Sequence, residues 1–199
     1  MKFSARRIFL SGCFALAAVL LAGCDSKPAF TNLDITGNTQ FGSDFSLPDS
    51  SGKVRTLGDF KGKVVVLFFG YTHCPDVCPT TLAELAQTMQ KLGDDAKRVQ
   101  VLMVTVDPAR DTPPILTEYV LAFSPSFVAL RPADTAQLVK ITKDFRVYYA
   151  QVPGKTPGDY TMDHTAASYV FDPQGKLRLF ARDGQGVDPW VHDLKLLLD

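Results

Sequence analysis

The chain has no long apolar segment, no excess of charge of either sign and no internal repeat. Its most apolar run, residues 8–21, is too short for an ordinary membrane span and is soon followed by the polar residues 25–32. The formal charge of the 199 residues is zero, and removal of residues 1–23 takes away three cations and no acid. The remaining chain, close to −3, offers no broad attraction for nucleic acid, so we expect no nucleic-acid partner.

The first residues have the pattern of an export signal. Lys2, Arg6 and Arg7 precede the short apolar run, which ends in the small residues before Cys24. The segment LAGC resembles a bacterial lipobox, so we expect residues 1–23 to be a lipoprotein signal peptide and Cys24 to carry the lipid. An uncleaved N-terminal anchor is the alternative. Both predict a membrane-tethered protein of the bacterial envelope, and Asp25 favours the periplasmic side of the inner membrane.

The chain has only four cysteines, and their positions limit what each of them can do. Cys13 falls in the signal and Cys24 is reserved for lipid, so Cys74 and Cys78 alone remain for the folded part. A disulfide between positions so close in sequence closes the smallest of loops and adds little stability. The pair is therefore better explained by chemistry than by structure.

The pattern along the chain predicts one α/β domain over residues 41–199, preceded by a polar tether at 24–40. Continuous β-branched runs predict strands buried on both faces, and helical spacing of apolar residues predicts the helices. We expect a loop, the longest irregular segment, from Tyr149 to Asp163. The expected order is a hairpin (45–60), a strand (63–69), a helix (80–93), a strand (99–107), a helix from 113, a strand (127–132), a helix (134–145), a second hairpin (166–182) and a final helix (187–198).

This alternation predicts a mixed sheet covered by helices on both faces, with the first hairpin as an N-terminal extension. A cysteine pair between a buried strand and the next helix is where a thioredoxin-like fold keeps its chemistry. We expect Cys74 in the loop and Cys78 in the first helical turn, where unpaired N–H groups favour thiolates. A thiolate is the reactive form both of a redox nucleophile and of a metal ligand, so this placement does not distinguish the two roles. Three residues separate the cysteines, whereas thioredoxin-type motifs have two.

Two thiolates alone underfill a zinc or copper site, which directs attention to the histidines. His73 adjoins Cys74 and is expected to point away, and His192 fits a surface position on the last helix. His164 ends the long loop, 86 residues after Cys78, and is the best third ligand. Two sulfurs and one imidazole suit Cu(I), with Cu(II) possible where a water or carboxylate completes the set.

The methionines and the aspartates after the second buried strand are weaker candidates for metal ligands. Met89 and Met103 fit core positions, whereas Met162 could reach the site but is better explained as a loop residue. Asp107 follows the second buried strand and could support the site from outside the ligand shell. Asp111 or Thr112 is expected to cap the next helix.

Three separated segments, FFGYTHCPDVCPTTL, VTVDPARDTP and DYTMDHTAASYVFDPQGK, resemble those of the Sco/SenC copper proteins. The resemblance implies a thioredoxin-like fold that binds one copper through Cys74, Cys78 and His164. It also implies a role in building the binuclear copper centre of cytochrome c oxidase. The implied partners are the copper-bearing oxidase subunit and a periplasmic copper donor or thiol reductant.

Two functions remain open from the residues. A copper metallochaperone, which is not an enzyme in the turnover sense, needs all three side chains. A thiol–disulfide oxidoreductase needs Cys74 and Cys78 but not His164, so the sequence favours copper. A peroxide-reducing enzyme of similar fold is a weaker third hypothesis, because it needs an arginine near the reactive cysteine and Arg110 is only a loose candidate for that role.

Overall fold

The computed structural model describes residues 29–199. The predicted signal peptide at 1–23 and the lipidated Cys24 lie outside the described residues. Within the described part, no helix combines the length and apolar character needed to cross a bilayer.

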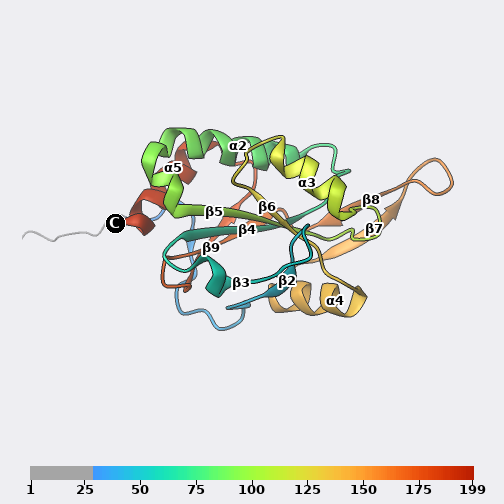
Figure 1. Ribbon diagram of the computed structural model, residues 1–199, viewed down its shortest axis with the longest axis horizontal. Helices are drawn as coiled ribbons and strands as arrows, with labels where there is room; N and C mark the ends of the chain where they lie inside the picture. The colour runs from blue at the N-terminus through green and yellow to red at the C-terminus, as the bar shows by residue number, and fades with distance from the viewer. Residues whose placement is uncertain (1–28) are drawn as a thin grey trace, which may run out of the picture.

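The centre of the protein is a six-stranded mixed sheet (Figure 1). All seven residues of β4 (Val64–Gly70) and of β5 (Val99–Thr105) are buried, as their continuous apolar sequences predict. These two strands pair in parallel, and β5 pairs in parallel with β6 (Val128–Leu130). On its other side β4 pairs antiparallel with β9 (Ala167–Phe171), which continues into β10 (Leu177–Arg182). The predicted mixed sheet and terminal hairpin are thus confirmed.

Helices cover both faces of this sheet, because alternate residues of each strand point to opposite sides. Val64, Val66 and Phe68 face the core beneath α2 (Val77–Leu92), α3 (Pro113–Leu121) and α5 (Val187–Leu198). Figure 1 shows these three helices on one side. Trp190 of α5 is fully buried in this core. A short 3-10 helix, η3 (Gly93–Arg98), joins α2 to β5.

The opposite face is covered by α4 (Thr135–Asp144) and by the N-terminal hairpin (Figure 1). That hairpin consists of β2 (Ser46–Pro48) and β3 (Val54–Thr56), followed by the 3-10 helix η2 (Leu57–Phe60). A cluster of aromatic rings around Phe145 and Tyr169 fills the space beneath. The predicted N-terminal β-hairpin extension and the thioredoxin-like arrangement are confirmed.

Two helix starts follow from local sequence. Asp134 precedes α4, and its carboxylate accepts the backbone N–H of Gln137 at 2.8 Å, as predicted. Thr112, not Asp111, occupies the N-cap position of α3, with Pro113 as the first helical residue.

The prediction of an irregular loop over 149–163 was wrong. The segment forms a hairpin of β7 (Tyr149–Pro153) and β8 (Tyr160–His164), with its turn at 154–159. Most of its residues are exposed or half-buried, so the strands lack the continuous apolar pattern by which a buried strand is found. Their stability comes from pairing with each other and from contacts that distant segments supply.

Part of the predicted tether, residues 24–40, contacts the folded domain. Strand β1 (Leu33–Asp34) pairs antiparallel with β10 at the sheet edge. The backbone N–H groups of Thr31 and Asn32 both donate to the Asp193 carboxylate at 2.8 Å. A two-residue strand has too little sequence for any periodicity, and the carboxylate that anchors it lies about 160 residues away. Residues 31–34 of the predicted tether are therefore attached to the sheet edge and to α5.

Candidate metal centre

The two cysteines lie where β4 leads into α2, as expected. Cys74 is half-buried in the connecting loop, and Cys78 is the second residue of α2 with 2% of its surface exposed. Neither cysteine is in a disulfide. The backbone N–H of Cys78 points at the Cys74 sulfur, 3.5 Å away. The Cys74 sulfur thus sits at the positive end of α2, where a thiolate is favoured.

His164 reaches the cysteines from the far end of the chain. It is the last residue of β8, and its Nε2 atom lies 3.5 Å from the Cys78 sulfur. Its Nδ1 atom lies 3.0 Å from the Thr165 carbonyl oxygen. Because a carbonyl can only accept, Nδ1 carries the proton and Nε2 is left as the metal-binding nitrogen.

The three side chains form one potential ligand set. One donor atom from each of Cys74, Cys78 and His164 lies within 4.8 Å of the other two. A metal ion at sulfur and nitrogen bonding distances of about 2.0–2.3 Å fits between donors so arranged. Two soft sulfurs and an imidazole favour Cu(I), and a set of three leaves a position open. The residues present therefore fit copper.

The two thiols have very different acidities in the metal-free protein. The Cys78 thiol, the His164 ring and two backbone N–H groups stabilise the Cys74 thiolate and lower its pKa to about 3. The Cys74 thiolate and burial together raise the pKa of Cys78 far above its ordinary value. One thiolate and one thiol therefore coexist near neutral pH.

The electrostatics of His164 follow from the same contacts. Burial alone would lower the pKa of its imidazole, but the Cys74 thiolate and the Thr165 carbonyl outweigh burial and raise it. Asp183, after β10, also contributes negative charge nearby. Burial raises the pKa of Asp183 to about 6, against a 2.6 Å hydrogen bond from Ser168 Oγ.

Two residues that shape the site were not identified from the sequence. Gly70, the last residue of β4, has no side chain, and a Cβ atom there would lie 2.7 Å from the Cys78 sulfur. Tyr71 is buried and meets the His164 ring edge-on at 5.9 Å between centroids. Sequence letters give no sign of either contact, because each joins segments that only the fold brings together.

The other histidines lie away from the ligand set, as predicted. The His73 ring is half-exposed, and its Nδ1 lies 3.1 Å from Thr72 Oγ1. His192 in α5 contacts the neighbouring Asp193 at 2.7 Å. Neither belongs to the cluster that Cys74, Cys78 and His164 form.

The two aspartates after β5 have distinct partners. Asp107 is buried, pairs with Arg110 and accepts the Tyr160 hydroxyl at 3.0 Å, and it forms no hydrogen bond with Cys74, Cys78 or His164. Its support for the site is thus indirect, through β8. Asp111 accepts the hydroxyls of Thr72 and Thr105 at 2.6 and 2.5 Å. It fastens the cysteine loop to β5 instead of capping α3. Arg110 donates hydrogen bonds to Asp107 and to the Tyr160 carbonyl of β8, and not to either cysteine sulfur.

The methionines behave largely as expected. Met103 is fully buried, and Met89 packs against the same core. Met162 is half-buried in β8 and lines an open pocket of about 520 Å³ beside Cys74 and His164. Tyr148, which is 64% exposed, also lines this pocket.

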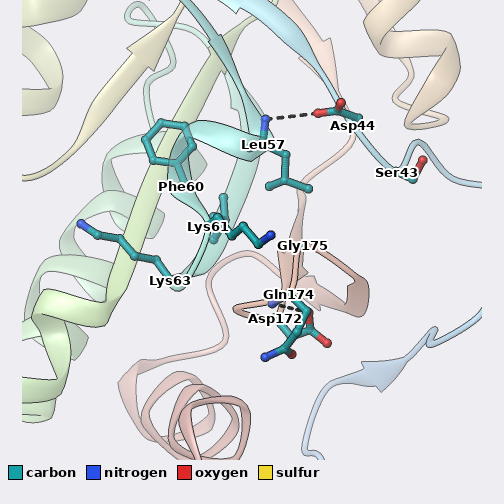
Figure 2. A pocket seen from close by; sticks show the side chains of 11 residues that line it. Ser43, Asp44, Leu57, Phe60, Lys61, Lys63, Asp172, Gln174 and Gly175 are labelled. Atoms are coloured by element: carbon teal, nitrogen blue, oxygen red, sulfur yellow. Dashed lines mark hydrogen bonds between the residues drawn. The ribbon is translucent and has the colours of Figure 1, made fainter.

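A separate pocket of about 270 Å³ lies at the other end of β4, near Val65, and contains neither cysteine nor histidine (Figure 2). Asp44 accepts the Leu57 N–H there at 3.1 Å. Lys61 extends toward Gly175 whereas Lys63 points away from it (Figure 2), so the two ammonium groups do not converge on one ligand.

Fold and site together define a thioredoxin-like protein with a Cys–Cys–His centre at the junction of β4, α2 and β8. The SCO1/SenC family matches residues 34–199. A SCO2-like protein of Rickettsia felis is 34% identical over 84% of this chain and 82% of its own length. The bovine mitochondrial SCO2 homolog is 41% identical over 66% of this chain, a match that spans 50% of that relative.

Solved structures agree. Bradyrhizobium japonicum ScoI with copper bound has a TM-score of 0.68 and 41% identity, covering 78% of this chain and 98% of that one. The chain belongs to the SCO1/SenC family. The resemblance seen in the three sequence segments is confirmed.

Proposed function

We propose that this protein binds one copper ion through Cys74, Cys78 and His164 and uses it in maturing the binuclear copper centre of cytochrome c oxidase. The observation that carries the proposal is the convergence of three donors within 4.8 Å. Family membership supports the acceptor, because Sco proteins act in the copper assembly of that oxidase. The copper is cargo, and its acceptor is the copper-bearing subunit.

The three ligand residues have different roles in binding copper. The Cys74 thiolate is available without loss of a proton, whereas Cys78 must lose one to bind. The Thr165 carbonyl orients the His164 ring so that Nε2 faces the sulfurs. Bound copper would be coordinated by these three groups, and its oxidation state would be the one in which the acceptor receives it. The half-buried Cys74 on the pocket side gives an incoming thiolate ligand of the acceptor access to the site.

An anaerobic Cu(I) titration of the reduced domain against a competing chelator tests this function. One tight equivalent is expected for the wild type, and none for Cys74→Ser/Cys78→Ser. His164→Ala should keep Cu(I), which two thiolates can hold, but lose most Cu(II) affinity. His192→Ala is the matched control and should behave as wild type. Undiminished Cu(II) binding by His164→Ala would contradict the ligand assignment.

Transfer to the acceptor is a separate measurement. Copper-loaded protein is mixed with the copper-free soluble domain of the oxidase subunit, and the copper content of each is measured after separation. We expect copper in the acceptor only when its cysteines are reduced. Copper that stays on the donor under those conditions would contradict delivery.

A thiol–disulfide oxidoreductase is the second candidate, and the unequal thiols favour it. The Cys74 thiolate would attack a partner disulfide, releasing one partner thiolate and forming a mixed disulfide. Cys78, after losing its proton, would then attack the Cys74 sulfur, releasing the second thiolate. The partner gains two electrons and this protein becomes disulfide-bonded. Reduction that survives His164→Ala, in a protein that retains no copper against the chelator, would favour this function.

We further propose that the domain is tethered through a lipid on Cys24 at the periplasmic side of the inner membrane. The LAGC segment and the relatives in bacteria support this location. Mass spectrometry of the mature N-terminal peptide tests it. A diacylglyceryl-modified Cys24, absent in Cys24→Ala, is expected, whereas an intact Met1 start would favour an uncleaved anchor.

A further inference from the structure

The hairpin that carries His164 is a separate piece of the structure. Strands β7 and β8 pair with each other in a two-stranded sheet and not with the six-stranded sheet. Figure 1 shows the hairpin extending beyond the body on the side away from the C-terminus. His164 is thus held on an element whose backbone ladder does not fix it relative to Cys74 and Cys78.

Arg110, in the loop after β5, fastens the start of β8 to the body. Its Nη1 donates to the Tyr160 carbonyl at 2.8 Å, and its guanidinium carbon lies 3.6 Å from the centre of the Tyr160 ring. Its Nε donates to the buried Asp107 carboxylate at 2.5 Å. The Tyr160 hydroxyl donates to the other Asp107 oxygen at 3.0 Å, which closes a ring of three residues.

This attachment lies on the same side of β8 as the metal ligand. Tyr160, Met162 and His164 are the half-buried residues of the strand, and the two between them are exposed. The Arg110 guanidinium carbon also lies 5.8 Å from the centre of the Tyr71 ring, which meets His164 edge-on. The Arg110 guanidinium thus lies near two tyrosine rings: Tyr160, at the start of β8, and Tyr71, which packs against His164.

We propose that Arg110 is a positioning residue for His164: with Asp107 and Tyr160 it holds β8 so that His164 Nε2 faces the two sulfurs. The inference rests on the proposed copper function. Because Cu(I) can be held by two thiolates but Cu(II) needs the imidazole, loss of the attachment should weaken Cu(II) and spare Cu(I).

The chemistry of arginine is specific to this role. A planar fork can donate to a carboxylate and a carbonyl while its face stacks on an aromatic ring, and an ammonium group cannot do all three. Arg110→Lys keeps a positive charge beside buried Asp107, so the fold is preserved while the stacking and the fork are lost. Tyr160→Phe keeps the ring and removes the hydroxyl bond to Asp107.

The matched control is Arg55→Lys. Arg55 also pairs with a buried aspartate, Asp49, at 2.7 Å, and the two arginine side chains are similarly exposed, 27% and 22%. It lies on β3, away from the ligand set. Cu(II) and Cu(I) affinities are measured by chelator competition, together with the Cu(II)–thiolate absorption spectrum.

We expect Arg110→Lys to weaken Cu(II) binding about tenfold, as typical for residues that orient a ligand, with Cu(I) affinity unchanged. Its Cu(II) spectrum should move toward that of His164→Ala, and Tyr160→Phe should show a smaller loss. In the double variant Arg110→Lys/His164→Ala the arginine change should add nothing further. A full additional loss there, or an equal loss in Arg55→Lys, overturns the positioning role.

The two proposals fail in distinguishable ways. Copper binding by the wild type that is indifferent to Arg110→Lys overturns the positioning role alone. A wild type without copper affinity rejects the copper function, and amide hydrogen exchange of the metal-free protein then decides the structural part. Faster exchange at Tyr160–His164 in Arg110→Lys but not in Arg55→Lys supports the attachment, and unchanged exchange overturns it.

Discussion

Gly70 and Cys78 approach each other so closely that position 70 has no room for a side chain. A Cβ atom on Gly70 would lie 2.7 Å from the Cys78 sulfur and 3.4 Å from the Phe68 ring. The strand that precedes the site thus determines where the buried ligand sulfur can lie. This relationship has a direct consequence for stability and metal binding.

Gly70→Ala should destabilise the fold by about 1–3 kcal/mol, because overpacking in a closed core forces neighbours to move. The displaced Cys78 sulfur should also weaken Cu(I) binding. Urea unfolding and chelator competition measure the two effects. Gly58→Ala is the control, since its nearest atom, Thr56 Oγ1, would lie at an ordinary 3.4 Å. Equal behaviour of the two variants would contradict the steric argument.

The two thiols should react at different rates with an alkylating reagent. Cys74 has a pKa of about 3 and is half-buried, whereas Cys78 is buried and its pKa is raised. Since the thiolate is the nucleophile, iodoacetamide at about pH 5 should modify Cys74 in the reduced, metal-free protein and leave Cys78 intact. Peptide mass spectrometry locates the adduct. Cys74→Ser should remain almost unmodified, and preferential labelling of Cys78 would refute the assignment of the thiolate.

Copper affinity should rise with pH. Cys78 holds its proton in the metal-free protein near neutral pH and must release it to bind the metal. The raised pKa of His164 adds a second proton at the acidic end of the range. We expect the apparent Cu(I) affinity to increase about tenfold per pH unit for the Cys78 proton. Calorimetry in two buffers of different ionisation enthalpy counts the released protons, and a count of zero would contradict the prediction.

Asp183 should make the protein less stable as pH rises. Burial raises its pKa to about 6 in the folded state from an ordinary value of 3.8. Its contribution is therefore fully present below about pH 4 and is lost as pH rises through about 6, on the order of 2–3 kcal/mol. Asp183→Asn should lack this fall, as judged by urea unfolding at about pH 4.5 and 7.5. Asp94→Asn, whose side chain is 96% exposed, should retain it. If the free energy of unfolding of Asp183→Asn still falls between these two pH values, another group causes the pH dependence.

The sequence predicted those parts of the fold that rest on local patterns. Strands β4 and β5 are continuous apolar runs, and their complete burial follows from that composition. Asp134 caps α4 with its carboxylate, and Pro113 fits the first position of α3 after Thr112. These element predictions placed Cys74 and Cys78 between a strand and a helix. His164 was predicted as the third ligand because the chain has few other soft metal donors.

The tertiary structure decided the contacts between distant segments. Strands β1, β7 and β8 are short or half-exposed, so that their pairing depends on partners and not on periodicity. Gly70 beneath Cys78, Arg110 on Tyr160 and Asp183 near His164 each join residues that are adjacent only after folding. Residue type determines which atoms can bind a metal, and local pattern determines where most elements form. Distances of a few ångströms between donors depend on how those elements pack, because His164 follows Cys78 by 86 positions in the sequence.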